Sequence, residues 1–203
     1  MPVVKKPGLF GFGVGIAASI VLVSGCTSVV PIAAASATPV ERPAVPPGWI
    51  PLASIDGRVE VVVPPDLTGL EQPSGLVVQG DFNGVATPIQ IWVSGPRDLL
   101  DQPGGSESAR EWLLRIGWLP QAGSGGVTTV SEESEGEVVL PQGLAYRAAL
   151  TADAGTAAAS RVVVYAISTS TGVAVIQILG DPATIQARAD ELNLIALLAN
   201  FSD

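Results

Sequence analysis

The sequence predicts an α+β fold in which an antiparallel β-sheet is flanked by a mid-chain helix and a C-terminal helix. Three observations predict it: short apolar runs separated by Gly, Pro and Ser, a hairpin-like pair of strong runs near the end, and two amphipathic segments that interrupt the strands instead of alternating with them. Hydrophobic residues make up 47% of the chain, which suits a folded core. Because only 5% of the residues are aromatic, this core has to be built largely from Val, Leu and Ile.

The N-terminus has the layout of a secretory signal peptide. Lys5 and Lys6 form a short basic region, and an uncharged, mostly apolar stretch follows at 9–25. Residues 22–26 read Leu-Val-Ser-Gly-Cys and resemble the lipobox of bacterial lipoproteins. The resemblance implies that Cys26 receives a diacylglyceryl group and becomes the acylated N-terminus, which holds the chain on the outer face of the cell membrane. The alternative is an uncleaved signal anchor.

These features divide the chain into three parts. A segment rich in Pro, Ala, Ser and Val follows the cysteine and predicts a semi-extended tether. Trp49 marks the expected start of the folded chain. The predicted parts are a signal peptide at 1–25, the acylated Cys26 with its tether at 26–48, and a single α+β domain at 49–203.

The first half of the domain contains three strand-like runs. Residues 58–63 alternate in polarity and stop at two prolines, which cannot continue a central strand. Residues 76–79 form a short run, and residues 89–93 alternate before a Ser-Gly-Pro break. Between these two runs, residues 81–84 (Asp-Phe-Asn-Gly) are typical of a turn.

The mid-chain helix is predicted at 108–118. Ser108 and Glu111 fit a capping box, in which each side chain bonds a free backbone N–H. Apolar residues then recur on one face, and Gly117 and Pro120 end the helix. That face consists of Ala109, Trp112, Leu113 and Ile116.

More strands follow, and a second helix ends the chain. The predicted strands are 127–130, 137–140, 144–150, 161–167 and 173–179. Residues 151–160 read as a loop, and residues 168–172 suggest a hairpin. Asp181 is a good N-cap and Pro182 suits the first turn of a helix whose apolar stripe runs to Phe201. On this stripe we expect Leu192 to be buried and its neighbour Glu191 to face water.

This order of elements resembles the PsbP-like extracytoplasmic fold, which includes actinobacterial lipoproteins of the LpqN type. The features that carry the resemblance are Val-Pro-Pro-Gly-Trp at 45–49, the helix with Trp112, and Val-Val-Leu-Pro-Gln-Gly at 138–143 before the hairpin and the final helix. They cover residues 49–201 and contain no catalytic signature. The resemblance implies an antiparallel sheet with helices on its faces and a C-terminal helix packed along it.

The residue types present exclude most catalytic chemistry. The chain has no histidine, and its one cysteine, Cys26, is committed to lipid. Both lysines fall in the segment expected to be removed. What remains is carboxylate-pair chemistry, for which Asp98 and Asp101 are close in sequence but lie in a Gly/Pro-flanked connection typical of solvated residues. We therefore expect no enzyme and no cofactor.

Two further motifs have an ordinary structural interpretation. Residues 131–137 place four carboxylates in seven positions, which suits either a weak calcium site or charges that protect an edge strand from pairing. The spacing from Glu132 to Glu137 is not that of the Asp-rich calcium loop, so edge protection is the favoured interpretation. The Gly-Ser-Gly-Gly segment at 123–126 lacks the lysine of a phosphate-binding loop and predicts a flexible connection.

The charge limits the partners. Without residues 1–25 the chain keeps 8 basic against 19 acidic residues, a net charge of −11, which argues against binding nucleic acid. The leading hypothesis is a membrane-tethered, non-catalytic module that binds a protein or an envelope component. The alternatives are a carrier of a small apolar or lipid ligand and a carboxylate-based enzyme. Trp118, just past the mid-chain helix, is the candidate partner contact.

Overall fold

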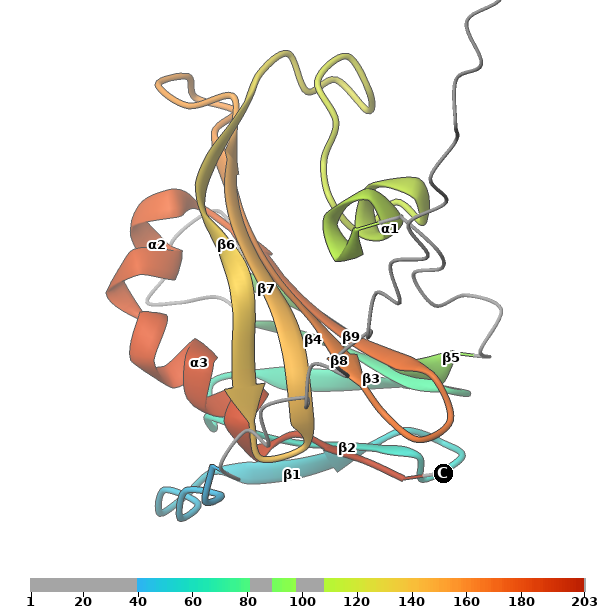
Figure 1. Cartoon of the computed structure of the whole chain (residues 1–203). Helices are drawn as coiled ribbons and strands as arrows, with labels where there is room; N and C mark the ends of the chain where they lie inside the picture. Colours follow the sequence, from blue (N-terminus) through green and yellow to red (C-terminus); the bar gives the residue numbers. More distant parts are fainter. Residues whose placement is uncertain (1–39, 81–88, 98–107, 203) are drawn as a thin grey trace, which may run out of the picture. The chain divides into compact units, whose positions relative to one another are not determined.

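The computed structural model describes residues 40–80, 89–97 and 108–202. Its elements are β1 (Ile50–Ala53), β2 (Val59–Val63), β3 (Thr68–Gln72), β4 (Gly75–Gly80), β5 (Ile89–Arg97), α1 (Ala109–Arg115), β6 (Val130–Leu140), β7 (Gly143–Ala152), β8 (Ser160–Ser168), β9 (Val173–Gly180), α2 (Pro182–Ala187), α3 (Ala189–Leu198) and β10 (Asn200–Phe201). Seven strands form an antiparallel sheet in the order β3-β4-β5-β9-β8-β7-β6, and three form a smaller one in the order β1-β2-β10. The predicted α+β class with an antiparallel sheet is confirmed (Figure 1).

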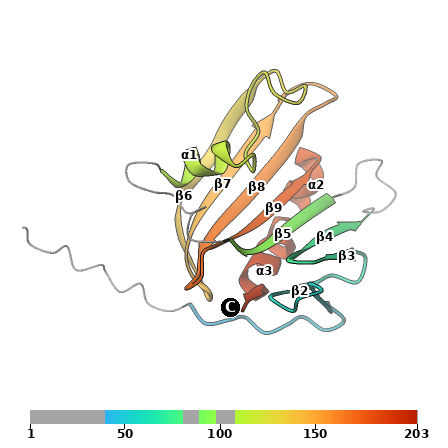
Figure 2. The same ribbon diagram turned by 90° about the vertical axis from the view of Figure 1, so that its right-hand side faces the viewer.

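The two faces of the seven-stranded sheet carry different helices (Figures 1 and 2). Successive strand residues point to opposite faces, so the buried residues divide into two clusters. The α3-side core packs α2, α3 and β2 against one face and includes Val61, Ile178 and Ile195. The α1-side core lies on the other face and includes Trp112 and Val164. Within the described ranges, no helix combines the length and apolarity needed to span a bilayer.

The mid-chain helix begins as predicted. The Ser108 backbone N–H donates to the Glu111 carboxylate at 2.8 Å, and the Glu111 N–H donates to Ser108 Oγ at 3.2 Å, which completes the capping box. Trp112 and Leu113 are fully buried, so the predicted apolar face is the contact face. The helix ends at Arg115, three residues earlier than predicted, and Gly117 follows with φ of 80°.

The C-terminal segment is two helices, not the single helix that the sequence predicts. Asp181 caps α2 through a bond from the Thr184 N–H at 2.9 Å. The helix breaks at Arg188, whose backbone leaves helical geometry at φ −109°. The Arg188 side chain is 4% exposed, and its guanidinium bonds Asp66 at 3.1 Å and Glu191 at 2.6 Å. The break therefore coincides with a buried arginine whose two carboxylate partners are exposed, and the local sequence pattern does not predict these ion pairs.

The strands differ from the prediction mainly at the edges of the sheets. Only Val130 of the predicted run at 127–130 is in a strand, and it begins β6, which continues through the acidic stretch and contains the whole run at 137–140. The pairing of β6 with β7 shifts register between Glu132 and Ser134. Strand β7 extends to Ala152, into the predicted loop. The strands β1, β3 and β10 were not predicted, and β10 takes the residues expected to end the last helix. The hairpin between β8 and β9 is confirmed.

Residues before Trp49, the expected start of the domain, already contact the folded chain. The Arg42 guanidinium lies 3.5 Å from the Ala199 carbonyl oxygen, at the end of α3. Gln142, from the turn between β6 and β7, donates its Nε2 to carbonyl oxygens at the same helix end, including that of Ala196 at 3.1 Å. These bonds satisfy carbonyl groups that a helix leaves unpaired at its C-terminus.

Candidate functional site

One row of apolar side chains crosses β3, β4 and β5. Leu70 pairs with Val77, and Val77 pairs with Trp92, so the three side chains lie on one face of the sheet. Trp92 in turn pairs with Gln177, and Gln177 pairs with Val164 of the α1-side core. The row therefore continues the face that α1 covers farther along the sheet.

An apolar groove of about 450 Å³ lies over this row. The Leu70 side chain is 62% exposed and that of Trp92 44%. A Cβ atom at Gly75, which also lines the groove, would overlap the Val93 carbonyl oxygen, so this position requires glycine. The described residues that line the groove are uncharged: Leu70, Gln72, Ser74, Gly75, Leu76, Val77, Trp92, Val93, Ser94 and Trp118.

Trp118, the predicted contact residue, lies at this groove. Its backbone N–H donates to the Leu113 carbonyl oxygen at 2.9 Å, which ties it to the end of α1. Its own carbonyl oxygen accepts from Gln177 Nε2 at 2.6 Å, which ties it to the sheet. The next residue, Leu119, is buried in the α1-side core. Both layers of the fold thus hold the half-buried Trp118 at the groove that Trp92 also lines.

Trp92 and Leu70 were not predicted as site residues. The alternation of residues 89–93 did contain a signal for Trp92, because Ile89, Ile91 and Val93 share the buried face and Trp92 has to point the other way. The sequence does not show that this second face is left open at β5. Leu70 carried no comparable signal, since β3 itself was not predicted.

A second groove lies on the other side of residues 117–120. Its volume is about 460 Å³, and Leu119, Val162, Gln177 and Leu179 are among its lining residues. The Gly-rich segment 123–126 forms part of its rim and is a loop without a following helix, as predicted. Both grooves are open to solvent, whereas a carrier needs an enclosed apolar cavity.

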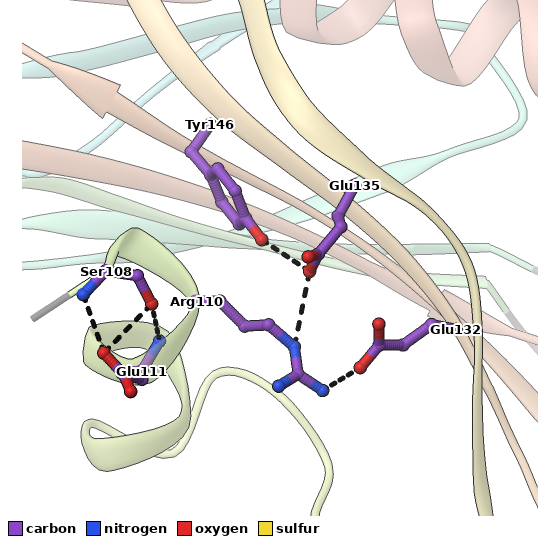
Figure 3. Close-up of polar contacts among 6 residues, drawn as sticks. All are labelled: Ser108, Arg110, Glu111, Glu132, Glu135 and Tyr146. Carbon is purple, nitrogen blue, oxygen red and sulfur yellow. Dashed lines mark hydrogen bonds and ion pairs between the residues drawn. The ribbon is translucent and has the colours of Figure 1, made fainter.

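The acidic stretch is the outer edge of the sheet, and three of its four carboxylates, those of Glu132, Glu133 and Glu135, are held in ion pairs. Arg110 of α1 lies between Glu132 and Glu135, with Nε 3.3 Å from Glu135 Oε2 (Figure 3). The Tyr146 hydroxyl donates to Glu135 at 2.7 Å. Burial and this bond to a carboxylate raise the pKa of Tyr146, so the phenol stays neutral. These contacts fasten α1 to the β6 edge.

The paired carboxylates of this stretch are divided between two arginines. Glu133 pairs with Arg161 at 2.5 Å and accepts from the Thr151 hydroxyl, so its carboxylate points away from the Arg110 cluster. In residues 40–80, 89–97 and 108–202, no group of three or more carboxylate or thiol side chains converges as metal ligands would. The edge-protection interpretation of this stretch agrees with its place on the outermost strand. Asp98 and Asp101 lie outside the described residues.

Asp153 is a buried carboxylate with a structural role. It is 7% exposed and has φ of 51°, in the left-handed region. Its Oδ1 accepts from the Thr128 N–H at 2.8 Å and the Thr129 N–H at 2.9 Å. Hydrogen bonds from both threonines lower the pKa of Asp153, which favours the charged form. The carboxylate joins the loop before β6 to the end of β7.

Comparisons with known proteins identify the fold and no closer relationship. No family model matches the chain, and no curated protein matches its sequence. Among solved structures, the chain is similar to the solution structure of cyanobacterial PsbP (CyanoP) from Synechocystis sp. PCC 6803. The TM-score is 0.56 with 9% sequence identity, over 78% of this chain and 95% of that chain. The domain therefore has a PsbP-like fold, as the order of elements predicts.

Proposed function

We propose that this chain is a lipid-anchored, extracytoplasmic accessory module that binds a protein partner through the Trp92 groove and catalyses no reaction. The observation that carries the proposal is an uncharged apolar groove with an exposed tryptophan and leucine. Aromatic side chains in such positions are enriched among residues that dominate binding energy at protein interfaces. General acid–base catalysis needs a titratable group, and the described residues lining the groove supply none.

The charge of the chain favours a particular kind of partner. Without residues 1–25, the anchored chain has a net charge of −11, so two copies repel each other at long range. The groove itself offers neither a cation nor an anion to pair with a charged segment. Burying an unpaired charge there would be costly. The segment that fits is uncharged, carries apolar side chains and belongs to a different protein.

The groove is tested by photocrosslinking from position 70. A photoreactive amino acid replaces Leu70 in the anchored full-length chain, and the crosslinked segment is identified by mass spectrometry of native envelopes. Trp92→Ala is expected to lower the crosslinking yield roughly 30-fold, because truncating such an interface residue costs about 2 kcal/mol.

Leu144→Ala is the matched control. Leu144 is 46% exposed, close to the 44% of Trp92, but lies at the β7 end of the sheet outside the groove. It is expected to leave the yield unchanged. Equal yields in the two variants, or a crosslinked segment rich in charged residues, would contradict the proposed groove and its partner.

The lipid anchor is tested at Cys26. Cys26→Ala removes the thiol that accepts the diacylglyceryl group, so we expect no lipid labelling, and release from membranes or accumulation of uncleaved precursor. Ser28→Ala, two residues away, is expected to be labelled normally. Fractionation with membranes and cleavage after residue 25 that are both unchanged in Cys26→Ala would refute the anchor.

A further inference from the structure

Gln177 is a polar residue in an otherwise apolar row of β9. On the same face of this strand, Val173 and Val175 are buried in the α1-side core and Leu179 packs against it. An amide at such a position costs free energy unless it is hydrogen-bonded. Its Nε2 donates to the Trp118 carbonyl oxygen at 2.6 Å, a short distance for this kind of bond.

The same side chain is next to the other tryptophan of the groove. Gln177 and Trp92 are direct partners on β9 and β5, so their Cβ atoms lie about 5 Å apart. One residue therefore packs beside Trp92 and binds the main chain of Trp118. The backbone N–H groups of Gly117 and Trp118 donate back to α1, at 3.2 and 2.9 Å, and not to the sheet.

We propose that Gln177 is the positioning residue of the groove, and that its bond to Trp118 sets the spacing between the two tryptophan rings. The inference rests on the proposed function, because partner binding is what the spacing serves. Leu119 is buried and keeps the segment attached when the bond is lost. Gly117, at φ of 80°, lies where the chain can turn with least steric restriction. Loss of the bond thus moves Trp118 without unfolding the domain.

The test uses Gln177→Met, which keeps the volume of the side chain and removes its donor. Gln90→Met is the matched control, because Gln90 is an amide on the same face of β5, two residues before Trp92, and does not line the groove. The first measurement is the set of indole N–H resonances from the four tryptophans. Gln177→Met is expected to shift the Trp118 resonance and to leave Trp49 in place, whereas Gln90→Met leaves Trp118 in place.

The second measurement is the crosslinking yield from position 70. We expect it to fall about tenfold in Gln177→Met, the loss that corresponds to one hydrogen bond's net contribution, and to stay unchanged in Gln90→Met. A Trp118 resonance that does not move overturns the positioning role. A shifted resonance with an unchanged yield shows that the spacing does not matter for binding and also overturns the proposal. If the chain that retains Gln177 gives no crosslink at all, the proposed function is overturned instead. The indole spectra then still show whether Gln177 positions Trp118.

Discussion

Leu192→Ala is expected to lower the free energy of unfolding by about 2–5 kcal/mol, through lost transfer energy and the cavity left behind. Leu192 is 3% exposed and belongs to the α3-side core, where α3 packs against β2 and the sheet. The chain has a single cysteine, so no internal disulfide offsets lost packing. Domains of this size are stable by only about 5–15 kcal/mol, so urea denaturation will resolve the effect.

The control for this variant is Asp190→Ala. The sequence predicts that its neighbour Glu191 faces water, and Glu191 is indeed exposed. It is a poor control, however, because its carboxylate accepts from the buried Arg188 at 2.6 Å. Asp190 is exposed in the first turn of α3, and its loss is expected to cost less than about 1 kcal/mol. Equal losses at 190 and 192 would mean that α3 is not an integral part of the core.

The sequence predicted the elements whose signals lie within a few neighbouring residues. The capping box at Ser108, the N-cap at Asp181 and the hairpin between β8 and β9 all depend on residues within a few positions of each other. The alternation of β2 and β5 reflects one buried and one less buried face, which period-two patterns report directly. These elements were enough to predict the fold class.

The unpredicted features depend on contacts between distant segments. The break at Arg188 coincides with a bond to Asp66, 122 residues away. Arg110 and Arg161 pair with three carboxylates of β6 on the sheet edge, and residues 131–136, which no strand pattern predicted, are part of that strand. The two-residue strand β10 exists only because β2 is beside it.

Of the candidate site, only Trp118 could be predicted from the sequence, because the other residues of the groove come together through contacts between distant segments. The position of Trp118 beyond a helix end predicts a contact residue, and this residue lies at an apolar groove. The rest of the groove is made of residues on three strands, which are brought together by register and not by spacing along the chain. That α1 leaves this part of the face uncovered follows from its seven-residue length and its packing on β7.

Trp112→Ala is expected to cause the largest loss of stability, about 3–5 kcal/mol. Trp112 is fully buried, as the sequence predicts, and it is the largest such side chain of the α1-side core. A helix as short as α1 has little stability of its own, so its place on the sheet depends on this packing. Because residues 117–120 follow directly from α1, the same variant should also displace Trp118 from the groove.

Trp112→Phe separates the stabilising effect of apolar packing from the cost of burying an unpaired N–H group. The Trp112 Nε1–H is buried and has no hydrogen-bond partner among the described residues, so replacing the indole by a phenyl ring removes an unpaired polar group while keeping most of the apolar contact. We expect this variant to cost less than about 1.5 kcal/mol and to leave the Trp118 indole resonance in place. The two variants are compared by urea denaturation and by amide exchange along α1. Trp112→Ala could instead leave the global free energy of unfolding unchanged and accelerate amide exchange in α1 alone. That result would mean that α1 opens independently of the sheet. The groove would then depend on a local opening equilibrium of α1 and not on the stability of the whole fold.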